Sequence, residues 1–146
     1  MFFERQGYHL FTFGDVDVAV SPWYLFLMAY IIFAPMLMGG GVMGGGIISG
    51  ISFAIAVTLA LLVHEYGHAL VSKYYKLAPS ILLHGFGGLC SHRPAESDKD
   101  DAIIVGAGPG AGILFGFVSW AGLAAVSALF EASQFKGLAT GFLGSL

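Results

Sequence analysis

The residues best able to do chemistry lie together at 64–68, where the sequence reads His-Glu-Tyr-Gly-His. Side chains four residues apart share one face of a helix, so His64 and His68 can direct two imidazoles at one metal ion. Glu65 lies beside that face, close enough to act on a water at the metal without ligating the metal itself. The H-E-x-x-H spacing therefore predicts a zinc site, with His64 and His68 as ligands and Glu65 as the general base.

The motif ends a long apolar stretch, and this location bears on its interpretation. No Asp, Glu, Lys or Arg occurs between Asp17 and Glu65. One interpretation is that the motif consists of polar side chains that reach the membrane interface from a helix end. Ionisable side chains within apolar spans are rare and usually functional, which favours the metal site.

The composition excludes several classes of protein. Apolar residues make up 57% of the chain and charged residues only 10%, whereas soluble domains carry roughly 25% charged residues. Such a chain is neither an ordinary soluble globule nor a disordered segment. A net charge of −3 gives no basic surface for nucleic acid, and the single cysteine, Cys90, excludes an internal disulfide. We expect a membrane protein in contact with the lipid bilayer.

Charge-free segments locate the expected membrane spans. The gap that begins at Asp17 has room for two helices of about 20 residues, and the gap from Asp101 to Glu131 has room for one. Six glycines within residues 39–46 predict a turn in the first gap. The fold predicted is an all-α membrane protein with three transmembrane helices, at about 22–38, 47–72 and 102–130. The apolar tail 137–146 resembles the start of a further span.

Two shorter regions predict β-structure. Residues 9–13 and 16–20 alternate around a Gly-Asp turn, which is typical of a hairpin, and residues 80–89 indicate either a strand with a glycine turn or a re-entrant loop. The loop 73–101 carries four of the six basic residues. The positive-inside rule then places this loop in the cytoplasm together with residues 1–21, and the metal site near the cytoplasmic face.

Small residues predict how the last span is held. Gly108, Gly112 and Gly116 recur every four residues and leave one helix face without side chains. Such faces let helices approach closely in lipid, and Gly67 in the motif offers a matching flat position. We expect the last span to pack against the motif helix, although a generic helix contact without catalytic meaning is the alternative.

Four segments, in chain order, resemble the site-2 proteases, which are intramembrane zinc metalloproteases, and in particular their small prokaryotic members. They are the N-terminal stretch leading into SPW at 21–23, HEYGHAL at 64–70, LHGFGG at 83–88 and AGPGAG at 107–112. The resemblance implies a zinc-dependent endopeptidase that cleaves transmembrane segments of other membrane proteins, as a multi-pass protein of a prokaryotic cytoplasmic membrane. It also implies Gly87 and Gly88 as substrate-binding residues, since an exposed strand edge can hold an unwound substrate by main-chain hydrogen bonds.

Two positions depart from the family pattern. The family's Asn in A-G-P-x-x-N falls on Gly112, and the family's third zinc ligand, an Asp in N-x-x-P-x-x-x-L-D-G, has no counterpart because the chain contains no Asn and no Asp-Gly pair. A catalytic zinc normally has three protein ligands. We therefore expect residues 22–146 to be a metalloprotease core truncated before the third-ligand helix, behind a cytoplasmic hairpin at 1–21. A natural short form is the alternative.

The loop after the motif holds the other candidates for a third ligand, which are His84, Cys90 and His92. We interpret them as a lone thiol and two interfacial histidines. Three functions stay open at this point. The chain is an active intramembrane protease, a non-catalytic relative that binds membrane helices without cutting them, or a membrane metal-binding protein.

Overall fold

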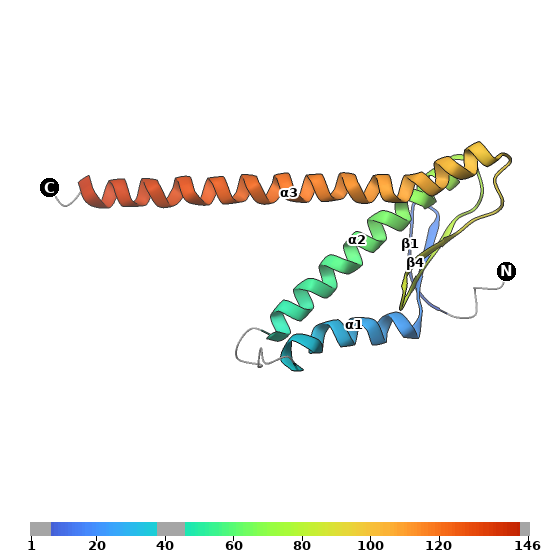
Figure 1. Cartoon of the computed structure of the whole chain (residues 1–146), viewed down its shortest axis with the longest axis horizontal. Coiled ribbons are helices and arrows are strands. Elements are labelled where there is room, and N and C mark those ends of the chain that lie inside the picture. Colours follow the sequence, from blue (N-terminus) through green and yellow to red (C-terminus); the bar gives the residue numbers. More distant parts are fainter. Residues whose placement is uncertain (1–6, 38–45, 144–146) are drawn as a thin grey trace. The chain divides into compact units, whose positions relative to one another are not determined.

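The computed structural model describes the backbone of residues 7–37 and 46–143, and the side chains of these segments as far as Glu131. Its elements, in chain order, are β1 (Tyr8–Phe13), β2 (Val16–Val20), α1 (Pro22–Pro35), α2 (Gly46–Tyr74), β3 (Ser80–His84), β4 (Gly87–Ser91) and α3 (Asp98–Leu143) (Figure 1). The chain forms two compact units, residues 1–112 and 113–146. The first unit contains every element except the later part of α3.

The predicted N-terminal hairpin is confirmed. β1 and β2 pair antiparallel, and Gly14 and Asp15 at the turn both have positive φ, near 58° and 59°. Two successive residues of this kind are typical of the tight turn whose twist matches that of paired strands. The hairpin is tied to α2, because Lys73 donates to the Gly14 carbonyl at 2.6 Å and Phe13 contacts the ring of Tyr66.

The strands form one four-stranded sheet in the order β1-β2-β3-β4. β2 pairs parallel with β3, so that Val18 faces Ile81, and β3 pairs antiparallel with β4. The prediction of an all-α protein is therefore corrected. The chain is mostly helical, with a small sheet built from both predicted β-regions. The physical reason is that β2 and β3, far apart in the sequence, supply each other's backbone hydrogen bonds, which no local pattern indicates.

The core lies between this sheet and α2. Val16, Val18 and Val20 alternate along β2 and are almost fully buried, and Ile81 and Leu83 extend the same apolar layer on β3. Ala69 of α2 and Tyr24 of α1 complete the cluster. Because Ala69 follows the motif directly, the layer fixes the motif end of α2 against the sheet.

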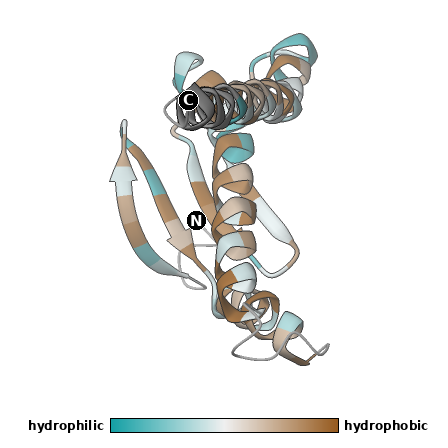
Figure 2. Cartoon of the chain, turned by 90° about the vertical axis from the view of Figure 1, so that its left-hand side faces the viewer, coloured by the Kyte–Doolittle hydropathy of each residue, from teal (hydrophilic) through white to brown (hydrophobic). Residues whose placement is uncertain are grey.

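The two long helices have the properties of membrane spans. Gly46–Tyr74 and the described part of α3, Asp98–Glu131, are long and apolar enough to cross a bilayer, and apolar residues predominate along α2 (Figure 2). α1 has 14 residues, a length of about 21 Å, against roughly 30 Å of hydrocarbon. The crossing predicted at 22–38 is thus not confirmed and stays a prediction. The glycine turn predicted at 39–46 lies, apart from Gly46, outside the described residues.

The end of the chain differs from the prediction of a separate apolar tail, because α3 is one helix from Asp98 to Leu143. The membrane span predicted at 102–130 lies within this helix and stays a prediction. A charged residue marks the end of an apolar run but is itself a good helix former, and a lone glycine costs only about 1 kcal/mol in a helix. The start of α3 is capped by Ser97, whose Oγ accepts from the Asp100 N–H at 3.2 Å.

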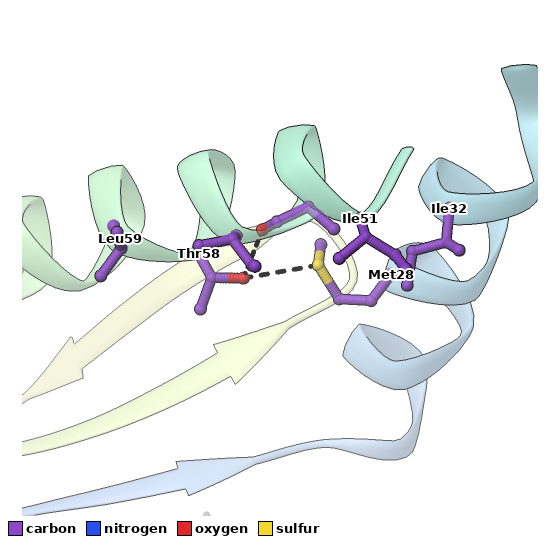
Figure 3. A pocket seen from close by; sticks show the side chains of 7 residues that line it. Met28, Ile32, Ile51, Thr58 and Leu59 are labelled. Carbon is purple, nitrogen blue, oxygen red and sulfur yellow. Dashed lines mark hydrogen bonds between the residues drawn. The ribbon is translucent and has the colours of Figure 1, made fainter. Parts of the chain in front are cut away.

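The C-terminal half of α1 packs closely against the N-terminal half of α2. Gly50 approaches the backbone of Ile32 so tightly that a Cβ there would overlap it. Further along, the Thr58 hydroxyl donates to the Ala54 carbonyl and meets the Tyr24 hydroxyl, both at 2.7 Å. The Thr58 hydroxyl also donates to the Met28 sulfur at 3.5 Å, and both side chains line an apolar pocket of about 290 Å³. Figure 3 shows these side chains. Polar side chains satisfied in this way suit an apolar environment.

We predict that cysteines placed at Thr12 and Glu96 label from one face of the membrane and a cysteine at Gly45 from the other, in a Cys90→Ala background. The contact of the hairpin turn with Lys73 places Thr12 at the same end of α2 as the loop that contains Glu96. Labelling of intact and permeabilised cells with a membrane-impermeant maleimide measures the sidedness. Labelling of Thr12 and Gly45 from the same face would contradict a crossing by α1.

Candidate metal centre

α2 brings the two motif histidines together. The Nε2 atoms of His64 and His68 lie 3.2 Å apart, and the two rings meet edge to face. Two imidazole nitrogens at about 2.0–2.1 Å from one tetrahedral zinc would be separated by about 3.3 Å. The pair therefore fits a shared zinc ion, and its role as ligands stays a prediction.

His68 is also held from α3. Its Nδ1 lies 2.7 Å from the backbone carbonyl of Ile104, to which it donates. The ring proton is thereby placed on Nδ1, which leaves the Nε2 lone pair free to face His64 and a metal. Sequence analysis missed this contact, since a backbone carbonyl carries no signal of residue type.

The glycines of α3 lie against the motif helix as expected, but with different partners. Gly67 packs on Ala107 and Ala111, where a Cβ would lie 2.8 Å from that of Ala111. Gly108 lies under the imidazole of His68, and a Cβ at Gly112 would be 3.7 Å from Nδ1 of His64. Gly116 has open space around it. Two of the three glycines thus face the histidines, which makes the contact specific to the site.

Glu65 is buried beside the histidines, with 5% of its surface exposed. Its carboxylate accepts a hydrogen bond from the backbone of Cys90 on β4. It also lies against Gly88, where any Cβ would overlap it. Gly88 is therefore at the site because only glycine leaves room for the carboxylate. Gly87 has a φ of 136°, which favours glycine. The role of both in substrate binding stays a prediction.

Two cavities meet at Glu65, and both are lined by His64 and Gly88. The smaller, of about 270 Å³, extends toward the end of α2. Its further lining residues are His68, Leu89, Cys90, His92, Ile104 and Val105. The larger, of about 550 Å³, extends toward the middle of α2, and its further lining residues are Val57, Ala60, Leu61, Gly87 and Gly112. Space is thus available on both sides of the carboxylate.

The residues described do not supply a third ligand. Among them no group of three or more His, Cys, Asp and Glu side chains is arranged to hold a metal ion. His84 stacks on Phe86, and Nδ1 of His92 bonds to the Arg93 carbonyl at 2.7 Å. Burial, and then the charge of Glu65, raise the pKa of Cys90 to about 11. Its thiol is consequently protonated at neutral pH, and a metal would have to displace this proton in order to bind.

A comparison with solved structures found a protein of similar fold. The site-2 protease from Methanocaldococcus jannaschii superposes with a TM-score of 0.61 over 77% of this chain, at 22% sequence identity. The chain has a site-2 protease-like fold. It spans about half of that protease, of which 49% is covered. No family model and no curated protein matches the sequence. At this identity the likeness establishes the fold, and the membrane protease neighbour together with the two apolar helices indicates association with a membrane.

We predict weak zinc binding that depends on the motif histidines. His64→Ala or His68→Ala should abolish binding, because each removes one of the two predicted ligands, whereas His84→Ala and His92→Ala should change the affinity little. Competition with a chromophoric chelator on the detergent-solubilised chain measures the Kd. If His92→Ala weakened binding as much as His68→Ala, the loop would be supplying a ligand.

Proposed function

We propose that this chain is the core of a zinc-dependent intramembrane endopeptidase that cleaves transmembrane segments of other membrane proteins. The observation that carries the proposal is the buried Glu65 carboxylate beside the His64–His68 pair, whose Nε2 atoms are 3.2 Å apart. The site-2 protease-like fold supports the same reaction class. Zinc is the cofactor proposed, since two imidazoles and an adjacent carboxylate suit zinc hydrolysis.

The residues of the site have separate tasks in this mechanism. His64 and His68 would hold the zinc, which when bound polarises a carbonyl and acidifies a water. Glu65 accepts the proton from the attacking water and then delivers it to the leaving amine. Its hydrogen bond with the Cys90 backbone holds the carboxylate in place for both transfers. This proposal assigns no third zinc ligand among the described residues.

β4 supplies the substrate contact in this proposal. It is an edge strand of the sheet, so an extended peptide could pair with its outer backbone groups other than the Cys90 N–H, which donates to Glu65. A peptide added beside Gly88 would bring a carbonyl next to Glu65, because Gly88 contacts that carboxylate. The two cavities would take side chains on either side of the scissile bond. Substrate helices must unwind to bind in this way.

The membrane arrangement proposed follows from charge and length. The chain would be a multi-pass protein of a prokaryotic cytoplasmic membrane, with α2 and α3 as crossings and α1 as a third. The basic residues of the loop 73–101 would place the site near the cytoplasmic face, with residues 1–21 on the same side and 22–146 as the protease core.

A second candidate is a non-catalytic relative that binds membrane helices. The observation in its favour is that no group of three His, Cys, Asp or Glu side chains among the described residues is arranged to hold a metal ion, whereas a catalytic zinc normally has three protein ligands. Such a protein would keep the β4 edge and the cavities but would not cleave. A membrane metal-binding role is less well supported, because it too needs further ligands.

We predict that Glu65→Gln loses cleavage of a membrane-helix substrate while retaining zinc, in a longer form of this chain that carries an Asp ligand. Gln matches Glu in size but cannot accept a proton, and general base catalysis is worth roughly 10²–10⁴ in rate. Cleavage of a tagged substrate in proteoliposomes measures the loss. The matched control is Glu96→Gln, an exposed loop glutamate that should cleave normally. Near wild-type cleavage by Glu65→Gln would contradict the mechanism.

A further inference from the structure

The two histidines of the motif are held differently. Nδ1 of His68 bonds to the Ile104 carbonyl at 2.7 Å, whereas within the described residues His64 has a hydrogen bond only to His68. A histidine whose second nitrogen is fixed by a hydrogen bond has a defined tautomer and a defined ring plane. Of the two, only His68 is therefore oriented before a metal arrives.

Gly108 of α3 lies against the face of the same ring. A Cβ at this position would overlap three atoms of the His68 imidazole, Nε2, Cε1 and Cδ2. The ring thus lies flat against the backbone of α3, four residues beyond the carbonyl that accepts its proton. Gly106 and Gly110, its neighbours in the same helix, have open space where a Cβ would stand. The close approach is consequently specific to Gly108.

We propose that the Ile104–Gly108 segment of α3 is a positioning element for His68: the Ile104 carbonyl holds the proton on Nδ1, and the bare backbone at Gly108 sets the ring plane, so that Nε2 faces His64. The inference rests on the proposed metal site for its function but not for its geometry. It makes zinc affinity depend on the packing of this segment against α2. By linkage, bound zinc in turn stabilises that packing.

The tautomer of His68 tests the geometry without any metal. Long-range ¹H–¹⁵N correlation spectra of the zinc-free chain at pH 8, with His68→Gln to assign its signals, distinguish a proton on Nδ1 from one on Nε2. We expect His68 to be predominantly protonated on Nδ1 in the wild type and in Gly106→Ala. In Gly108→Ala we expect this preference to disappear, because the displaced ring leaves the Ile104 carbonyl. A wild-type His68 protonated on Nε2 would overturn the proposal.

Zinc affinity tests the consequence. Gly108→Ala should bind zinc about 10- to 100-fold more weakly than the wild type, as is usual when a partner of a metal-bound histidine is lost. Gly106→Ala and Gly110→Ala should bind as the wild type does. Alanine favours a helix over glycine, so a loss confined to Gly108→Ala cannot come from a weakened α3. Equal affinity in all three variants would overturn the proposal.

Failure of the metal site and failure of the positioning element give different results. If the wild type bound no zinc, the proposed function would lose its basis, while the tautomer spectra would still decide whether α3 orients His68. If Gly108→Ala did not fold, the wild-type tautomer would decide the question alone.

Discussion

The structure depends on how three polar side chains are accommodated in an apolar helix. Imidazole and carboxylate groups that leave water need hydrogen-bond partners, since a buried polar group without one is costly. His68 finds its partner on α3, at the Ile104 carbonyl, and Glu65 finds its partner on β4, at the Cys90 backbone. Both partners are main-chain groups, so α3 and β4 must approach α2 closely. The glycines at the two contacts, Gly108 and Gly88, permit that approach.

The hydrogen bond between Glu65 and β4 also joins the sheet to the motif. β4, which contacts Glu65, pairs with β3, and β3 in turn pairs in parallel with β2 of the N-terminal hairpin. Lys73 bonds to the hairpin turn through the Gly14 carbonyl and through Asp15 at 2.9 Å. These exposed contacts contribute little stability. They join the hairpin turn to the end of α2 that carries the motif.

The sequence predicted those parts whose causes are local. The spacing of His64 and His68 predicted that the two imidazoles lie together, and alternation predicted the hairpin. The parallel pairing of Val18 with Ile81, and the hydrogen bond from His68 to Ile104, depend on long-range approach and on main-chain atoms, which leave no pattern in side-chain types. The length of the apolar run was misleading at the end of the chain, where α3 continues as a helix beyond Glu131. A charged residue marks the end of an apolar segment, whereas the end of a helix depends on its capping residues and backbone hydrogen bonds.

The measurement that tests the central claim most directly is zinc K-edge X-ray absorption on the zinc-loaded chain in detergent. The account predicts a first shell of nitrogen and oxygen at about 2.0–2.1 Å, with multiple scattering from two imidazoles. In His64→Ala and in His68→Ala the two-imidazole signature should be lost. A sulfur scatterer at about 2.3 Å would assign Cys90 as a ligand. That result would contradict only the exclusion of Cys90, whereas an unchanged spectrum in either histidine variant would contradict a zinc site built on His64 and His68.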